Sequence, residues 1–539
     1  MGKMLPNAMG KMLMGIALLL VVTSPALAQT PKRGGIFHVP APEAPTLDPH
    51  LNAGFVTQVY ASLIYSNLVR LPGGPELRGP GDHRILPDVA EKWEWTGPTT
   101  VVFTLRRGVR FHQKPPVNGR EVTADDVKFS LERFRARSAI GLRLEPVQSI
   151  DVLDRRTVRI VLKEPYAPLL NHLANPANCA ILPREVAERF TDFNSPEAAI
   201  GTGPFVLKSY ERGVRAVYER NPQFHLPGLP YLDGVVVEVV PENATRLAML
   251  RAGKLELGHW WGWLTPEEGR SLRRTNPELT VTSQMVVDVA HIYMRTDQPP
   301  FNDARVRRAV SLSIDRKSWR ESLHFGEGCL DSGPVPCAMP DWKLDAATLD
   351  PARRKYLDGY DPAEAKKLLA EAGYPRGLTA PLAHWPGYAA PWRSYYDLTV
   401  DTLARVGITA ELKPEEYGRY STMTFLGKYD KMAMGPFGAG ITEIDEVLYE
   451  TFAGASPRNR SHVNDPELDK MLVAQRRELD PARRREIVLD IQRYLADKVY
   501  YVYLPMWPRY IVHPAYVKGF RNQDGFGLGS RLMYTWFDR

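Results

Sequence analysis

The 539-residue sequence lacks the short motifs by which most enzymes are recognised. It has no His-Glu-x-x-His, no Gly-x-Ser-x-Gly elbow and no phosphate-binding loop ending in Lys-Ser or Lys-Thr. None of its 12 histidines lies two to four residues from another histidine or from a cysteine, as metal ligands often do. We therefore predict no catalytic site, no metal site and no cofactor. An exported hydrolase whose nucleophile is assembled from distant residues remains the alternative, because it would leave no such motif.

Cysteine is scarce, with only Cys179, Cys329 and Cys337. Three thiols at these spacings do not form a zinc site. Cys329 and Cys337 bracket a short loop rich in proline, and an oxidising compartment permits a disulfide between them. The spacing alone does not distinguish that bridge from two free thiols. Cys179 has no partner if the bridge forms, and is then either buried or free.

Long apolar runs are missing as well, because no stretch after the first 28 residues approaches 18 unbroken apolar residues. The exception is a short run at residues 12–22, preceded by Lys3 and Lys11 and followed by Ala26-Leu27-Ala28. This order is typical of a secretory leader, whose cleavage site needs small side chains. A run of this length is too short to cross ~30 Å of hydrocarbon permanently.

We therefore expect cleavage after Ala28 and a mature protein in the periplasm. Gly-Lys-Met-Leu occurs twice near the start, so either Met1 or Met9 can be the initiator. No cysteine stands at the cleavage point, which argues against a lipid anchor. A buried N-terminal helix is the alternative interpretation of this segment.

The net charge of +7 falls to +5 without the leader, and the charges of both signs are interspersed. Short basic groups at residues 305–308, 353–355 and 483–485 lie in helix-like stretches and are interpreted as solvated faces. A nucleic-acid partner would require a sustained basic stripe with interleaved aromatics, so we expect none.

Short β-rich runs alternate with helical stretches, which predicts an α/β fold of two or three domains. Strands are expected at residues 101–106, 157–162 and 235–240. Helices are expected at residues 124–137 after the N-cap Thr123, at 361–372 before Gly373, at 398–406 and at 481–497. Proline and glycine predict loops at residues 71–81, 222–230, 333–340 and 384–391.

A series of motifs runs in fixed order along the chain: Gly34-Gly35-Ile36-Phe37, Thr46-Leu47-Asp48-Pro49-His50, residues 86–94, 103–112 and 122–127, Gly201-Thr202-Gly203-Pro204-Phe205, Phe301-Asn302-Asp303, Ile314-Asp315-Arg316, Tyr360-Asp361-Pro362 and residues 465–469. In this order the chain resembles the periplasmic dipeptide-, oligopeptide-, nickel- and opine-binding proteins of ABC importers, bacterial extracellular solute-binding family 5. The motifs themselves are interpreted as turns and caps that determine the fold.

The resemblance implies a type II periplasmic-binding-protein fold, in which two lobes close on a solute. Lobe I would combine residues 29–70, 200–300 and 505–539, with an accessory domain at 71–199. Lobe II would comprise residues 301–504, and the hinge would lie near residues 300 and 505. The implied role is that of a monomer that hands a small-molecule solute, a peptide or peptide-like compound, to a membrane permease.

In peptide-binding relatives an acid holds the ligand's ammonium and an arginine its carboxylate. Arg393 falls where dipeptide binders place that arginine, although a surface arginine at a helix start is the alternative. The acid is missing from its usual place in the stretch after Pro436, to which Phe437 belongs. Glu443 or Asp445 would replace it after a small register shift; otherwise the ligand lacks a free ammonium.

Tryptophan is unusually dense where relatives carry smaller side chains, at Trp260, Trp261 and Trp263. Its flat face stacks on rings and cations, but packing between lobes is an equal interpretation. Further aromatic residues expected near the cleft are Trp385, Trp392 and Trp507. This departure leaves opine, glycosidic and metal-chelate ligands open, the last with His259, His291 or His384 as contacts. A binding module coupled to a chemoreceptor is the remaining alternative.

Overall fold

The computed structural model describes residues 30–51, 55–79, 82, 84–176, 178–259, 264–285, 287–330, 333–387, 390–438, 443–522 and 527–539. The named helices and strands all belong to one unit, Lys32–Arg539, and the preceding segment is a separate unit. Within the described ranges, no helix has both the length and the apolar character needed to cross a membrane.

The first sheet has the strand order β1 (Ile36–Ala41), β10 (Gly234–Val239), β9 (Arg215–Arg220) and β8 (Phe205–Glu211). β1 pairs with β10 in parallel, and the other pairs are antiparallel. The valine run of β10 is buried, as expected for a strand covered on both faces. Helix α1 (Phe55–Ile64) packs against β8.

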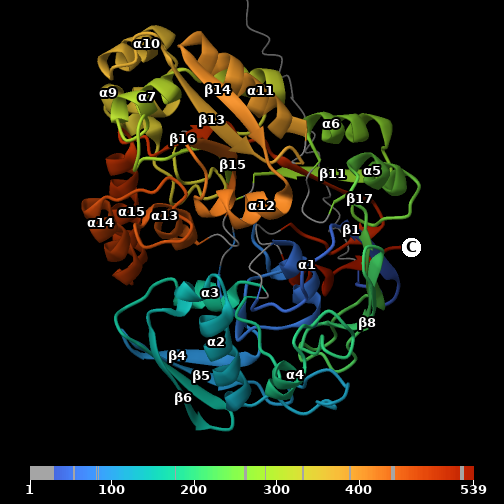
Figure 1. The fold of residues 1–539 in the computed structure, drawn as a ribbon. Coiled ribbons are helices and arrows are strands. Elements are labelled where there is room, and N and C mark those ends of the chain that lie inside the picture. The colour runs from blue at the N-terminus through green and yellow to red at the C-terminus, as the bar shows by residue number, and fades with distance from the viewer. Residues whose placement is uncertain are drawn as a thin grey trace, which may run out of the picture. The chain divides into compact units, whose positions relative to one another are not determined.

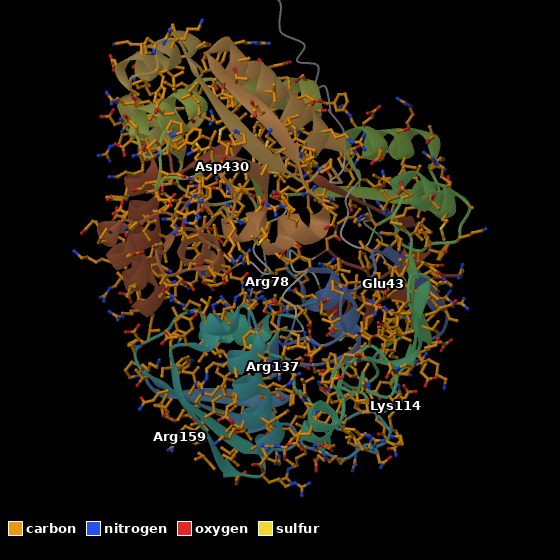
Figure 2. All side chains as sticks on the ribbon, viewed as in Figure 1. Glu43, Arg78, Lys114, Arg137, Arg159 and Asp430 are labelled. Atoms are coloured by element: carbon orange, nitrogen blue, oxygen red, sulfur yellow. A yellow bond between two sulfur atoms is a disulfide. The ribbon has the colours of Figure 1, made fainter. Side chains whose placement is uncertain are left out.

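The second sheet is antiparallel, in the order β4 (Ala90–Gly97), β5 (Thr100–Leu105), β7 (Thr157–Leu162) and β6 (Val147–Asp154). Helix α2 (Ala124–Arg137) packs on it (Figure 1). The backbone N–H of Thr123 donates to Asp126, one half of the capping box that starts α2. Charged side chains of both signs cover the face of the unit seen in Figure 2.

The third sheet has five strands, in the order β14 (Ile408–Pro414), β13 (Leu378–His384), β15 (Met432–Gly438), β12 (Asp288–Met294) and β16 (Tyr501–Leu504). It is mixed: β13 is parallel to β14 and β15, whereas β12 is antiparallel to both of its neighbours. Helix α11 (Ala390–Arg405) packs on β14, and α7 (Ala304–Leu312) on α10 (Pro362–Glu371).

A two-stranded sheet adjoins the third sheet in sequence: β11 (Leu279–Gln284) pairs with β17 (Arg509–Pro514). β11 is followed by β12, and β16 is followed by β17. The chain therefore passes twice between this small sheet and the third sheet, once between Gln284 and Asp288 and once between Leu504 and Arg509.

The remaining helices are α3 (Leu169–Ala174), α4 (Arg184–Arg189), α5 (Asn243–Arg251), α6 (Pro266–Thr275), α8 (Arg316–His324), α9 (Pro351–Asp358), α12 (Tyr417–Thr422), α13 (Ile444–Phe452), α14 (Pro466–Arg477), α15 (Pro481–Leu495) and α16 (Gly529–Leu532). Single turns of 3₁₀ helix are η1 (Gly74–Glu76), η2 (Gly141–Leu144), η3 (Ala346–Thr348) and η4 (Thr424–Leu426). Two short pairs complete the strands: β2 (Val69–Arg70) with β3 (Leu86–Pro87), and β18 (Val517–Lys518) with β19 (Trp536–Phe537).

The predicted strands at 101–106, 157–162 and 235–240 are β5, β7 and β10, and the predicted helices at 124–137, 361–372 and 481–497 are α2, α10 and α15, each within two residues at either end. Asp361 caps α10 by accepting from the Glu364 N–H at 2.9 Å, and Gly373 follows with φ +94°. The predicted helix at 398–406 starts too late, since α11 begins at Ala390. The predicted loop at 384–391 ends too late for the same reason, because a proline such as Pro391 in the first turn of a helix lacks only an N–H that would be unpaired anyway.

The disulfide that the sequence left open is formed: Cys329 and Cys337 are bridged, with their Cα atoms 6.6 Å apart. Cys179 is a free thiol and is buried. Burial raises the pKa of this thiol to about 12, so Cys179 is an inert core residue.

Candidate functional site

The end of β15 and the start of β12 lie opposite each other, with Gly438 in register with Asp288. The Asp288 side chain is buried, and its Oδ2 accepts from Arg509 Nη2 at 2.8 Å. Arg509 is the first residue of β17. A buried ion pair therefore joins the start of β12 to the start of β17, next to both crossings of the chain.

Asp288 retains unused hydrogen-bonding capacity. Its Oδ1 is buried and has no hydrogen-bond partner in the described part of the chain. Burial raises the pKa of Asp288 to about 6 in spite of the neighbouring Arg509 guanidinium. A carboxylate oxygen in this state can accept a hydrogen bond from a bound molecule, and a positive donor would be favoured.

Two of the predicted tryptophans lie in the interior beside this ion pair. Trp392 and Trp507 are each 1% exposed, and their rings meet edge to face with centroids 5.9 Å apart. The Arg509 guanidinium lies 4.9 Å from the Trp507 ring centroid. Tyr395 and His324 complete the cluster, with centroids 5.6 and 5.3 Å from that of Trp507. These contacts hold Arg509 in place by packing and cation–π attraction.

Arg393 lies in the first turn of α11, next to Trp392 in sequence, and its side chain is exposed. It has no ion pair or hydrogen bond to any described residue. Trp385 is half-buried at the end of β13, and its carbonyl accepts from Tyr396 Oη at 3.1 Å. Of these two predicted contacts, Arg393 is the one with free donors.

Glu443 and Asp445 stand at the N-terminus of α13 and are both buried. Glu443 accepts from Arg484 Nη2 at 2.5 Å, from the Asp445 N–H at 3.1 Å and from Asn171. Asp445 accepts from Gln475 Nε2 at 2.7 Å and pairs with Arg476 at 3.1 Å. Burial alone would raise the pKa of both carboxyls, but the adjacent arginines outweigh it and lower the pKa of each.

These two acids belong to a larger ionic contact, which we call the α13 contact: residues 143–175 against residues 443–484. Arg143 Nη1 lies 2.9 Å from Glu446, and Arg143 Nε donates to Glu450 at 2.8 Å. His172 lies 3.7 Å from the carboxylates of both Asp445 and Glu446. Burial opposes the charged form of His172, but these carboxylates outweigh it and raise its pKa. The contact is thus built from compensated charges.

The remaining predicted contacts are separated or lie outside the described residues. Trp260, Trp261 and Trp263 belong to the segment 260–263, which the structure does not describe. Phe437 is described only as a backbone position of β15, paired with Val289. His259, His291 and His384 are buried, and burial lowers the pKa of each. No metal-binding group of three or more His, Cys, Asp or Glu occurs among the described residues.

Sequence reasoning missed Asp288 and Arg509. They are 221 residues apart, and neither belongs to a motif. The sequence shows each of them only as an isolated charged residue at the start of an apolar stretch with the pattern of a strand. Such charges are common at strand ends, so the sequence did not single them out.

Comparison with known proteins adds three findings. Residues 84–458 match the sequence model of the bacterial extracellular solute-binding proteins, family 5, middle region. The chain is 28% identical over 534 residues to di/tripeptide-binding protein 2 of Pseudomonas aeruginosa, covering 93% of each protein. It is also 28% identical over 425 residues to heme-binding protein A of Haemophilus influenzae, covering 73% of each.

Solved structures agree with this similarity. The periplasmic binding protein DppA of Helicobacter pylori, in complex with the peptide STSA, superimposes with a TM-score of 0.81 at 25% identity, covering 94% of this chain and 99% of that one. MoaA of A. tumefaciens R10, in complex with mannopinic acid, gives a TM-score of 0.78 at 25% identity, covering 94% and 100%. The α/β fold predicted from the sequence is therefore that of the type II binding proteins.

Proposed function

The chain belongs to the bacterial extracellular solute-binding proteins of family 5, and we propose that it captures a peptide or peptide-like solute between two closing lobes and delivers it to the permease of an ABC importer. The observation that carries the proposal is similarity to peptide-binding proteins over nearly the full length of both chains. A role in transport rather than catalysis accords with this family.

We place the solute at the end of β15, beside the two crossings of the chain. Arg393 is exposed and unpaired among the described residues, and it is the proposed partner of a solute carboxylate. Asp288 Oδ1 is the proposed acceptor for a solute ammonium. Glu443 and Asp445 were expected in that role, but their carboxylates already compensate Arg484 and Arg476. Apolar contacts are assigned to Phe437, Trp260, Trp261, Trp263 and Trp385, with Trp392 and Trp507 as packing support.

The two crossings at 285–287 and 505–508 are the proposed hinge. The first lies nearer the N-terminus than residue 300, because β12 already belongs to the third sheet. Lobe II would then include β12, while the small β11–β17 sheet stays with lobe I. A solute that contacts both lobes only in the closed form would shift the population towards the closed form. The permease would then recognise that closed form. In this proposal the leader is cleaved after Ala28, and the mature protein is a monomer in the periplasm.

The test uses protein purified from Gln29 onward and stripped of ligand by reversible unfolding. Its melting temperature is recorded with dipeptides, tripeptides, opines, oligosaccharides, haem and chelated nickel. A ligand at about 100 times its Kd stabilises the folded state by about 2.7 kcal/mol, a shift of several degrees. A shift with peptides supports the proposal. A shift only with opines, sugars or haem supports the transport role but excludes a peptide as the solute. If no compound shifts the melting temperature, the proposed solute site is contradicted.

A further inference from the structure

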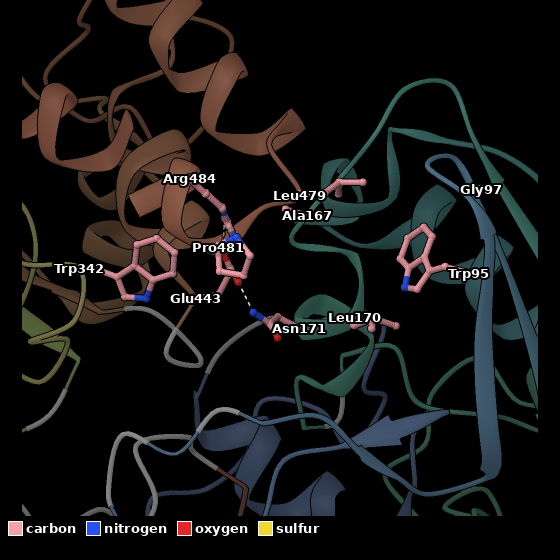
Figure 3. A pocket seen from close by; sticks show the side chains of 10 residues that line it. All are labelled: Trp95, Gly97, Ala167, Leu170, Asn171, Trp342, Glu443, Leu479, Pro481 and Arg484. Carbon is pink, nitrogen blue, oxygen red and sulfur yellow. Dashed lines mark hydrogen bonds and ion pairs between the residues drawn. The ribbon is translucent and has the colours of Figure 1, made fainter. Parts of the chain in front are cut away.

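A cavity of about 450 Å³ lies beside the α13 contact and is lined by none of the residues proposed to contact the solute. One wall comes from the second sheet and α3, with Trp95, Leu170 and Asn171. The other comes from residues 342–484, with Trp342, Glu443, Leu479 and Arg484. Its volume lies within the range of small-molecule sites, about 300–1,000 Å³. Figure 3 shows Trp95 and Trp342 on opposite sides, with Arg484 and Glu443 between them.

The side of the cavity nearest the second sheet is apolar. Trp95 of β4 and Leu170 of α3 are half-buried and line it. Leu479, from the opposite wall, adds an apolar side chain that is 44% exposed. A tryptophan and two leucines in one cavity provide a surface that an apolar or aromatic body would cover.

The opposite side carries one unused positive donor. The Arg484 side chain is 8% exposed. Its Nε donates to Gln475 and its Nη2 to Glu443 and Gln475. Its Nη1 has no partner among the residues that the structure describes, although Arg484 lines the cavity. Trp342 lies 5.4 Å from the guanidinium and holds it from the other side.

The acids and amides of the cavity do not compete for this donor. Both oxygens of Glu443 already accept hydrogen bonds, from Arg484 and the Asp445 N–H on one and from Asn171 on the other. The charge of this carboxylate is already compensated by Arg484, which disfavours a bound cation. A carboxylate would find an unused guanidinium N–H of Arg484, and charge-assisted bonds of this kind are stronger than neutral ones.

We propose that this cavity is a second binding site, which takes a small aromatic carboxylate with its ring on Trp95, Leu170 and Leu479 and its carboxylate on Arg484. The site shares no residue with the proposed solute site at Asp288 and Arg393. Because its two walls come from the two sides of the α13 contact, a bound molecule links them and stabilises that contact.

The experiment titrates the full mature chain with indole-3-acetate by calorimetry. Indole-3-acetamide has the same shape without the charge, and tryptamine carries the opposite charge. We expect one equivalent of indole-3-acetate to bind, with the amide at least tenfold weaker and tryptamine not binding. Trp95→Ala should weaken indole-3-acetate at least tenfold. Trp93→Ala is the matched control, since Trp93 is a half-buried tryptophan of the same strand that does not line the cavity.

One further variant, Arg393→Ala, together with Trp95→Ala, separates this proposal from the proposed function. Arg393→Ala should leave indole-3-acetate binding unchanged, and Trp95→Ala should leave peptide binding unchanged. If Trp95→Ala fails to fold, Trp95→Phe is used and should retain binding at reduced affinity. The proposal is overturned if indole-3-acetate does not bind at millimolar concentration, if amide and acid bind equally, or if Trp95→Ala and Trp93→Ala lose affinity alike.

Discussion

Two buried ionic regions of this protein differ in how completely their charges are used. In the α13 contact, Arg143 is shared by Glu446 and Glu450, while Glu443 and Asp445 pair with Arg484 and Arg476. At the crossings, Asp288 pairs with Arg509 through one oxygen and leaves the other unused. The carboxylates of the α13 contact are already compensated by arginines, whereas Asp288 keeps a buried acceptor oxygen without a hydrogen-bond partner among the described residues.

The pKa directions reflect the same difference. The carboxyls of Glu443, Asp445 and Glu450 have lowered pKa values, because arginines outweigh the cost of burial. The pKa of Asp288 is raised to about 6, because burial there outweighs the effect of Arg509 and the smaller effect of Arg460. A further cation at Asp288 would restore the balance, and a solute ammonium is such a cation. We therefore assign Asp288 to solute binding, whereas the carboxylates of the α13 contact hold residues 143–175 against residues 443–484.

The largest expected effect is on stability, at the α13 contact. Arg143→Ala removes the cation shared by two buried glutamates and should lower the free energy of unfolding by about 3–5 kcal/mol. Urea denaturation followed by fluorescence measures it. Arg159→Ala is the control, because Arg159 pairs with Asp151 at 2.9 Å on an exposed surface (Figure 2) and should change stability by less than about 1 kcal/mol. Equal effects of the two substitutions would contradict a structural role for the α13 contact.

The next largest effect is on solute affinity, at Asp288. Asp288→Asn keeps an oxygen for Arg509 but removes the negative charge, so affinity for a dipeptide with a free amine should fall about 10- to 150-fold, as for loss of a charged hydrogen bond of about 1.5–3 kcal/mol. The N-acetylated dipeptide should lose much less. Calorimetry with both peptides measures the ratio. An unchanged ratio would remove Asp288 from the solute site.

Arg393→Ala tests the other end of the solute. The side chain is exposed and unpaired within the described ranges, so its loss should leave the melting temperature unchanged. Affinity for a dipeptide should fall about tenfold, the lower end for a charged hydrogen bond because water screens an exposed site. A C-terminally amidated dipeptide serves as the control and should bind both proteins alike. A lower melting temperature without loss of affinity would make Arg393 structural.

Local signals predicted much of the fold but little of this comparison. Thr123, Asp125 and Asp126 predicted the start of α2, and Asp361 with Gly373 predicted both ends of α10 to within a residue, because caps act on neighbouring backbone. The Asp288–Arg509 and Arg143–Glu450 pairs join residues 221 and 307 positions apart. No local pattern encodes such pairs, since only the folded chain brings them together.

The candidate site was predicted only in part, for the same reason. The position of Glu443 and Asp445 after β15 followed from the motif order, but their partners Arg484 and Arg476 lie on later helices. The sequence therefore offered two acids in the right segment without showing that they were already compensated. Arg393 was placed before the predicted helix at 398–406, with a helix start as the alternative, and the structure puts it in the first turn of α11.

The smallest expected effect is a pH dependence that separates the two regions. Because the pKa of Asp288 is about 6, its charge forms as pH rises from 5 to 7, and affinity for a free-amine dipeptide should rise by somewhat less than tenfold. The N-acetylated dipeptide, and Asp288→Asn with either peptide, should show little change. Calorimetry at pH 5, 6 and 7, corrected for buffer ionisation, gives the comparison.

The stability of the α13 contact should not depend on pH over most of the range from 5 to 7, because of the directions in which its pKa values are shifted. The lowered pKa values of Glu443 and Asp445 mean that their contribution to stability is lost only as pH falls below the ordinary carboxyl range near 4. The pKa of His172 is raised in the folded protein, so its contribution to stability is complete at pH values below about 6.5, the ordinary value for histidine. This contribution is lost only as pH rises through the raised pKa of the folded protein. Affinity that is flat from pH 5 to 7, or that follows a loss of stability, would place the working acid elsewhere than Asp288.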